Sequence, residues 1–227
     1  MKNSNEIDIA QKLIRCKSIA PNADNALSVV EKECKAIGFK CTKLKFSEKG
    51  YDSISNLYAE IGNGKPHFSF AGHVDVVPAN KKDWSVDPFK GVIKNNSLWG
   101  RGAVDMKSAI ACFLLASKNY LKENKNFKGK ISLVVSGDEE QYALNGTPKI
   151  LKWLKKKKIK INNCLVGEPT NLNVLGDQIK IGRRGGYNGV VTVFGKEGHS
   201  AWPSRTKNPV SALIKMLTNI DKKVLDR

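Results

Sequence analysis

The sequence has no apolar run near the roughly 18 residues needed to span a bilayer, and its first ten residues, MKNSNEIDIA, lack the apolar core of a signal peptide. We therefore expect no membrane-spanning helix and, by default, a cytoplasmic location. Cysteine pairs with C-x-x-C spacing are absent too, since the five cysteines are scattered along the chain. We therefore predict reduced thiols, and neither a disulfide framework nor a zinc knuckle.

Acidic residues are few beside basic ones: 21 Asp and Glu against 39 Lys and Arg give a net charge of +18. A balance of this size can indicate a nucleic-acid partner. However, the basic residues are nearly all lysines spread over the chain, and arginine, which suits bidentate phosphate contacts, is scarce. The densest run, at residues 155–158, closes an amphipathic helix, where cations complement the helix dipole. A solvated surface that attracts an anionic substrate is the favoured interpretation.

The hydrophobic pattern alternates between helical and extended segments. The 227 residues, 41% hydrophobic and 26% charged, are typical of a globular protein with a substantial core. Apolar spacing predicts helices at residues 6–16, 25–37, 147–158 and 208–221, and another from Met106 onward. β-prone runs predict strands at residues 40–46, 56–61, 67–77, 131–135 and 163–166, with a loop at 80–100. The order predicts an α/β fold.

The stretch ISLVVSGDEE, residues 131–140, is the most informative one. Its apolar half is predicted to be a strand buried on both faces, and Asp138, Glu139 and Glu140 follow at the carboxyl end, where ligands bind in open α/β sheets. Three adjacent acids repel one another unless a cation or proton offsets their charge. A metal site explains the cluster economically, and a solvated acidic turn is the alternative.

The predicted strand at residues 67–77 ends in the pair His73 and Asp75. Because alternate residues of a strand point the same way, Asp75 can lie behind His73, accept its second ring N–H and fix the tautomer that binds metal. A buried structural pair is the alternative. His67 lies six residues upstream, about 20 Å away at roughly 3.3 Å per residue, so the two histidines cannot serve one site.

Two more acidic residues lie where one predicted element ends or another begins. Asp105 comes after Gly100 and Gly102, at or just before a helix, where its alternative role is an N-cap. Glu168 directly follows the strand at residues 163–166. Mixed histidine and carboxylate sets suit zinc, cobalt or manganese, and a carboxylate can bridge two ions roughly 3.5 to 4 Å apart. In that case Glu139 and Glu140 can divide the work, one binding metal and the other accepting a proton.

The pattern changes near Asp177. Residues 178–182 and 186–194 are predicted to be antiparallel strands, and His199 follows in a turn before the last helix. We therefore predict a catalytic domain at residues 1–176 and the start of a smaller α+β domain at 177–227. Two strands and a helix bury little surface alone, so the second domain looks unfinished.

Six motifs carry a family resemblance. They are GHVDVVP (72–78), WGRGAVDMKSA (99–109), SGDEE with NGT (136–147), CLVGEPT (164–170), GRRG (182–185) and GHSAWP (198–203). They resemble the motifs of the zinc-dependent aminoacylase and carboxypeptidase-like amidohydrolases. GRRG in its position points towards the members that hydrolyse N-succinyl-LL-2,6-diaminopimelate to succinate and diaminopimelate. The resemblance implies a mixed, largely parallel sheet flanked by helices, with a smaller dimerisation and lid domain.

The resemblance also implies residue roles. His73 and Glu168 would bind one zinc, Glu140 would contribute to a second, and Asp105 would bridge them, with cobalt as a possible substitute metal. Glu139 would be the general base, and Asp75 would orient His73. His199 would stabilise the reaction intermediate in the active site of a neighbouring subunit of a homodimer, unless it is an exposed turn residue. Arg183 and Arg184 would bind substrate carboxylates, unless they only end a surface strand.

The chain departs from this family in length. Family members continue beyond the second domain, return to complete the first sheet and supply a final histidine to the second zinc. We therefore expect an N-terminal portion with a complete first site, a deficient second site and weak or no activity of its own. A related deacylase of acetylornithine, a dipeptidase and a catalytically incomplete metal-binding or dimerisation fragment are the alternative functions.

Overall fold

A computed structural model describes residues 5–182, 185, 189–199 and 201–222 of the chain. The chain forms two compact units, Met1–Ile179 and Lys180–Arg227, which are described separately. The division lies three residues beyond the predicted boundary after residue 176. In the described part of the chain, no helix is long and apolar enough to cross a membrane. All five cysteines are free thiols.

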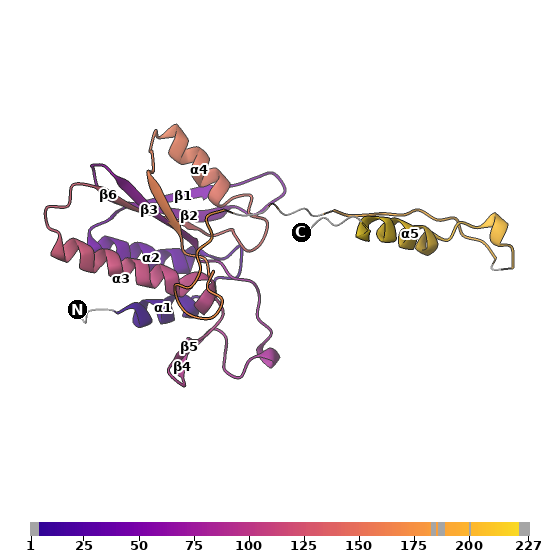
Figure 1. Cartoon of the computed structure of the whole chain (residues 1–227), viewed down its shortest axis with the longest axis horizontal. Coiled ribbons are helices and arrows are strands. Elements are labelled where there is room, and N and C mark those ends of the chain that lie inside the picture. The colour runs from indigo at the N-terminus through magenta and orange to yellow at the C-terminus, as the bar shows by residue number, and fades with distance from the viewer. Residues whose placement is uncertain (1–4, 183–184, 186–188, 200, 223–227) are drawn as a thin grey trace. The chain divides into compact units, whose positions relative to one another are not determined.

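The first unit is built on a five-stranded sheet in the order β1-β2-β6-β3-β7 (Figure 1). The strands are β1 (Lys40–Phe46), β2 (Ile54–Gly62), β6 (Lys130–Ser136), β3 (His67–His73) and β7 (Asn163–Val166). β1 pairs with β2 and β2 with β6 in antiparallel fashion, whereas β3 pairs in parallel with both β6 and β7. Only β2 therefore runs against the others, which confirms the predicted mixed, largely parallel sheet.

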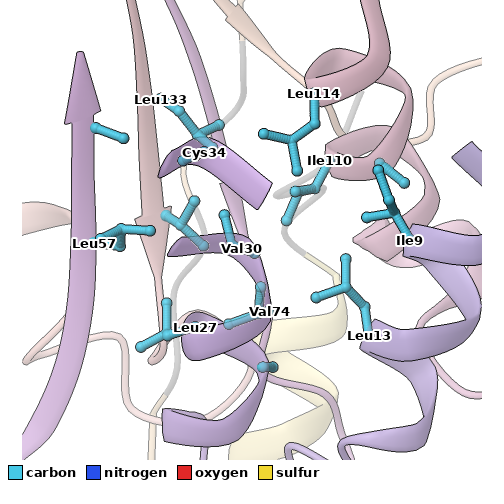
Figure 2. Packing of buried hydrophobic residues seen from close by; sticks show 14 of the residues in the cluster. Ile9, Leu13, Leu27, Val30, Cys34, Leu57, Val74, Ile110, Leu114 and Leu133 are labelled. Carbon is cyan, nitrogen blue, oxygen red and sulfur yellow. The ribbon is translucent and has the colours of Figure 1, made fainter. Parts of the chain in front are cut away.

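Helices cover both faces of this sheet (Figure 1). α1 (Glu6–Arg15), α2 (Asp24–Ile37) and α3 (Ser108–Glu123) lie on one face, and α4 (Thr147–Lys156) packs on the other. Figure 2 shows the larger core, in which apolar side chains of α1, α2 and α3 meet those of β2 and β6. The smaller core joins Ile150 and Leu154 of α4 to Tyr58 and Val134 of the sheet. The predicted flanking helices are thereby confirmed.

The helix ends follow from local chemistry. Asn5 caps α1 by accepting a hydrogen bond from the N–H of Asp8, and the Asp8 side chain accepts one from the N–H of Asn5. Gly38 ends α2 in the left-handed region at φ 104°, where a side chain would be strained. Pro148 occupies the first turn of α4, as predicted, where its missing N–H costs no helical hydrogen bond.

The strand register decides where the site forms. His73 at the end of β3 lies beside Ser136 at the end of β6, and Ala71 of β3 lies beside Val166 at the end of β7. The segments that leave β3, β6 and β7 therefore start from the same edge of the sheet. Strand β6 is buried almost throughout, which confirms the interpretation of ISLVV as an interior strand.

Two predicted segments differ from the structure. β3 ends at His73 and not near residue 77. Val74 still donates its N–H to the carbonyl of Ser136, but beyond it the chain bonds to the loop after α1: the Ser18 hydroxyl donates to the carbonyl of Val74, and the N–H of Val76 donates to the carbonyl of Ser18. The predicted loop at residues 80–100 contains a short hairpin of β4 (Val92–Lys94) and β5 (Ser97–Trp99) after a turn at Lys81–Asp83. Its strands are too short for a hydrophobic pattern to reveal.

In the second unit, α5 (Pro209–Asp221) confirms the predicted last helix and is capped by Asn208. The predicted strands are wrong for the residues that are described, 178–182 and 189–194, since none of these forms a strand. Their apolar side chains, such as Ile181 at 98% and Val190 at 94% exposure, cover no core. Alternating apolar residues do not form a stable pair of strands unless one face is buried.

His67 lies in a buried polar network within the first unit. Its Nδ1 is 2.9 Å from the carbonyl oxygen of Lys160, and its Nε2 is 2.8 Å from the hydroxyl of Ser132, which lies 2.9 Å from the hydroxyl of Ser69. Burial lowers the pKa of His67 from 6.5. A carbonyl at Nδ1 needs a ring donor, so the neutral ring has Nε2 as acceptor.

This network predicts a dependence of stability on pH. Because the folded chain holds His67 with a pKa below 6.5, the unfolded chain takes up a proton first as the pH falls. The contribution of His67 is therefore complete above the unfolded pKa and is lost as the pH falls through the folded value. Urea unfolding at about pH 7.5 and about pH 5.5 should show that the stability difference between wild type and His67→Gln shrinks at the lower pH. A constant difference would contradict the assignment.

Candidate metal centre

The centre is built around the imidazole of His73, which is 1% exposed at the end of β3. Its Nε2 lies 2.9 Å from Oδ1 of Asp105, 3.4 Å from Oε1 of Glu168 and 3.9 Å from Oε2 of Glu139. The structure thus brings together acids that follow β5, β7 and β6. Asp105 and Glu139 are about half exposed, at 48% and 41% of their side-chain surface, so the cluster opens to solvent on one side.

The second ring nitrogen of His73 faces Asp75, as expected, but through a different atom. Nδ1 is 2.9 Å from the backbone oxygen of Asp75 and 3.6 Å from its carboxylate Oδ1. A carbonyl acceptor requires a proton on Nδ1, which leaves the lone pair of Nε2 directed at the cluster when the ring is neutral.

The Asp75 carboxylate also binds the chain after β6. Its Oδ2 accepts hydrogen bonds of 2.9 Å from the N–H groups of both Glu139 and Glu140. Asp75 is fully buried, and its Oδ1 has no hydrogen-bond partner in the described part of the chain. One buried carboxylate just after β3 therefore holds the backbone of Glu139 and Glu140, a role that the sequence pattern did not reveal.

Asp105 sits in a tight turn, Ala103–Lys107, that precedes α3. Gly102, at φ 81°, admits the turn, and the N–H of Lys107 bonds to its carbonyl. The alternative N-cap role is not observed, since the N-cap of α3 is Lys107, without a side-chain cap, and the Asp105 carboxylate faces His73.

Lys107 was missed by sequence reasoning because lysine is rarely fully buried. It is 0% exposed, and its ammonium donates to the carbonyl of Leu13 near the end of α1. Burial lowers its pKa to about 8, against the opposing effects of Cys16 and Asp75. Its hydrogen bond ties the Asp105 turn to the first helix.

The donor set fits a divalent cation. Ligand atoms of His73, Asp105 and Glu168 all lie within 4.8 Å of one another. Burial alone would lower the pKa of His73, but hydrogen bonds and charges of Asp75 and Glu168 outweigh it and raise the pKa to about 11. Burial and neighbouring carboxylates raise the pKa values of Glu139 and Glu140. The excess of negative charge and the imidazole–carboxylate chemistry suit zinc and similar ions.

The other predicted site residues have different placements. Glu140 contributes its N–H to Asp75, while its carboxylate is not part of the three-residue group among the described residues. His199 belongs to the second unit, where its Nδ1 accepts from the N–H of Ala201 in an exposed turn. Arg183 and Arg184 lie outside the described residues.

The fold and the site together define a class: an α/β protein with a candidate divalent-cation site, formed by a histidine and several carboxylates near the ends of its strands. Residues 69–225 match the model of Peptidase family M20/M25/M40, and because this is more than half of the chain, the chain belongs to that family.

Within and beyond this family, the chain is similar to individual named proteins. The chain is 51% identical over 228 residues to a succinyl-diaminopimelate desuccinylase of Pelagibacter ubique (strain HTCC1062), covering 100% of this chain and 59% of the relative. It is 50% identical to the enzyme of that name from Parvibaculum lavamentivorans (strain DS-1), covering 97% and 55%. A tripeptidase from Staphylococcus aureus subsp. aureus Mu50 shares the fold with a TM-score of 0.63 at 14% identity, covering 94% of this chain and 55% of that one. The chain thus spans between half and three fifths of these proteins.

The geometry predicts one zinc site that depends on His73. Zinc titration of metal-free protein by calorimetry should show binding that His73→Ala weakens at least about 100-fold, since removal of a ligand should cost no less than the loss of its supporting residues. His67→Gln, a histidine at the other end of the same strand, is the matched control and should leave the affinity unchanged. Equal zinc affinity of wild type and His73→Ala, both shown to be folded, would refute the site.

Proposed function

We propose that the chain is the metal-binding part of an amidohydrolase that converts N-succinyl-LL-2,6-diaminopimelate to succinate and LL-2,6-diaminopimelate. The observation that carries the proposal is 51% identity across the whole chain to a named succinyl-diaminopimelate desuccinylase, with His73, Asp105 and Glu168 gathered at the sheet edge. Because the chain spans 59% of that relative, the activity is assigned to the full-length protein.

The proposed metal ligands are the group of His73, Asp105 and Glu168, together with Glu140. His73 and Glu168 would hold one zinc, Asp105 would bridge to a second, and Glu140 would contribute to the second. Cobalt would be an alternative metal. Zinc at this position would supply Lewis-acid polarisation of the scissile carbonyl. Asp75 would keep Nε2 of His73 free to coordinate by holding the proton on Nδ1.

Glu139 is the proposed general base. Its Oε2 lies 3.9 Å from Nε2 of His73, so the carboxylate lies beside the group of His73, Asp105 and Glu168 without belonging to it. Its raised pKa, caused mainly by burial, brings its basicity closer to neutral pH and suits proton transfer. In this role Glu139 would take a proton from the attacking water and deliver it to the leaving amine.

The substrate and assembly are further parts of the proposal. The substrate is a small anionic N-acyl amino acid, and Arg183 and Arg184 would bind its carboxylates by planar pairing. The second unit would mediate homodimerisation, so that His199 serves the site of the partner subunit. A cytoplasmic location is proposed with this biosynthetic role. The basic surface would attract the substrate and not nucleic acid.

The general-base role predicts the effect of Glu139→Gln. The amide keeps the size of the side chain but cannot accept the proton, so turnover in the full-length protein should fall by about 10²- to 10⁴-fold. Zinc affinity measured by calorimetry should stay close to that of wild type. A turnover equal to wild type would exclude Glu139 as the base, whereas loss of zinc would assign it as a ligand.

The substrate assignment predicts a preference for succinyl over acetyl groups. Initial rates of the full-length protein on N-succinyl-diaminopimelate and on N-acetylornithine should differ in kcat/KM by at least about 100-fold, because an acetyl group would leave the groups proposed to pair with the succinyl carboxylate without a partner. Faster release of acetate would identify a deacetylase, and faster cleavage of a dipeptide would identify a dipeptidase.

A further inference from the structure

The segment between β6 and α4, residues 137–146, forms a loop that carries Glu139 and Glu140. From one side the loop is held by Asp75, through the two amide N–H groups described above. Asp75 is remote in sequence and lies two residues after the end of β3. The opposite side of the loop is held by a second aspartate, Asp138, that neither the metal group nor the proposed reaction uses.

Asp138 is turned into the loop and is 4% exposed. Its Oδ1 accepts a hydrogen bond of 3.2 Å from the N–H of Ala143, and its Oδ2 accepts one of 2.8 Å from the N–H of Asn145. Its own N–H donates to the hydroxyl of Ser136 at 3.0 Å. Asp138 thus closes the loop on itself immediately before the acidic pair.

The loop is also anchored to the sheet. Asn56 of β2 accepts from the N–H of Gly137 and donates to the carbonyl of Asn145, so one amide holds both ends. The Asn145 side chain donates to the carbonyl of Asp52. At Gly146 a Cβ would overlap the carbonyl oxygen of Asp138, so the closed form of the loop requires glycine there.

We propose that Asp138 is a positioning residue that sets the direction of Glu139 and Glu140. Two aspartates hold the loop. Asp138 binds the amides of Ala143 and Asn145, and Asp75 binds the amides of Glu139 and Glu140. The Glu139 carboxylate, 3.9 Å from Nε2 of His73, and the Glu140 side chain therefore leave a backbone that is hydrogen-bonded on both sides. The catalytic part of this inference rests on the proposed function.

The test is Asp138→Asn in the full-length protein. The amide has one acceptor oxygen, and its NH₂ group opposes either the N–H of Ala143 or that of Asn145, so one loop bond is replaced by repulsion. Amide exchange at residues 139–145 should become about 10- to 100-fold faster. Turnover should fall about 10- to 100-fold with KM within about threefold, because displacement of a catalytic group by about 1 Å costs that much. Zinc affinity at His73 should stay within about threefold.

Asp177→Asn is the matched control. Asp177 also accepts hydrogen bonds from loop amides, those of Leu172, Asn173 and Val174, at distances of 2.8 to 3.2 Å, but the turn that it closes, residues 172–177, contains no candidate site residue. It should leave turnover near that of wild type. If Asp138→Asn does not fold, Ser136→Ala removes only the acceptor of the Asp138 N–H and should lower turnover about 3- to 10-fold.

The outcomes separate this inference from the proposed function. Reduced turnover with unchanged zinc affinity and faster exchange confined to the loop supports the positioning role. Unchanged turnover in a folded variant, or a parallel loss of turnover and zinc affinity, overturns it. If the wild type hydrolyses no acylated amino acid, the proposed function fails, and amide exchange alone decides: faster exchange at Glu139 and Glu140 supports the inference and unchanged exchange overturns it.

Discussion

Parallel pairing of β3 with β6 on one side and β7 on the other sets the level at which each candidate ligand leaves the sheet. His73 is level with Ser136, and Ala71 with Val166, so the acids after β6 and β7 start at the height of the imidazole. A slip of one residue would turn His73 to the opposite face. The register is in turn fixed by the core, because Phe70, Leu133 and Val135 pack against helices on one face. Core packing and ligand geometry are therefore specified by the same contacts.

The site concentrates negative charge in a chain whose net charge is +18. Asp75 and Asp138 are both buried, and each accepts hydrogen bonds from backbone N–H groups; among the described residues, neither forms a direct ion pair with a lysine or arginine side chain. Amide donors stabilise a carboxylate without neutralising its net charge. Lys107, the buried lysine of the described part, bonds to a helix carbonyl instead. The charge on the acids is thus left available to attract a cation, while the surface lysines act at longer range.

Sequence reasoning found what local patterns encode. The pair His73 and Asp75, the acids 138–140 and Glu168 each follow an apolar run, and parallel strands have to bring such ends together. It did not predict which oxygen of Asp75 binds Nδ1 of His73, since the backbone carbonyl of Asp75 lies closer to the ring than its carboxylate does. Nor did it separate Asp138 from its neighbours, because three adjacent acids look alike until the loop closes. Lys107 was missed because its burial depends on contact with α1, far away in the sequence. The predicted strands near residues 178–194 failed because alternation alone does not supply a surface to cover them.

These differences have one physical origin. Residues whose role depends on their place at a strand end are predictable, because the pattern of the neighbouring residues in the sequence reveals the strand and where it ends. Residues whose role depends on long-range closure, such as Asp75 bonding to the amides of Glu139 and Glu140, require the tertiary structure. In this chain the hydrogen bonds between Asp75 and the amides of Glu139 and Glu140 lie within the first unit, as does the group of His73, Asp105 and Glu168. The residues proposed to choose the substrate and reach a partner, Arg183, Arg184 and His199, belong to the second unit. With these proposed roles, metal binding and substrate selection would lie in different units, so that a change in the second unit could alter the substrate without changing the metal-binding residues.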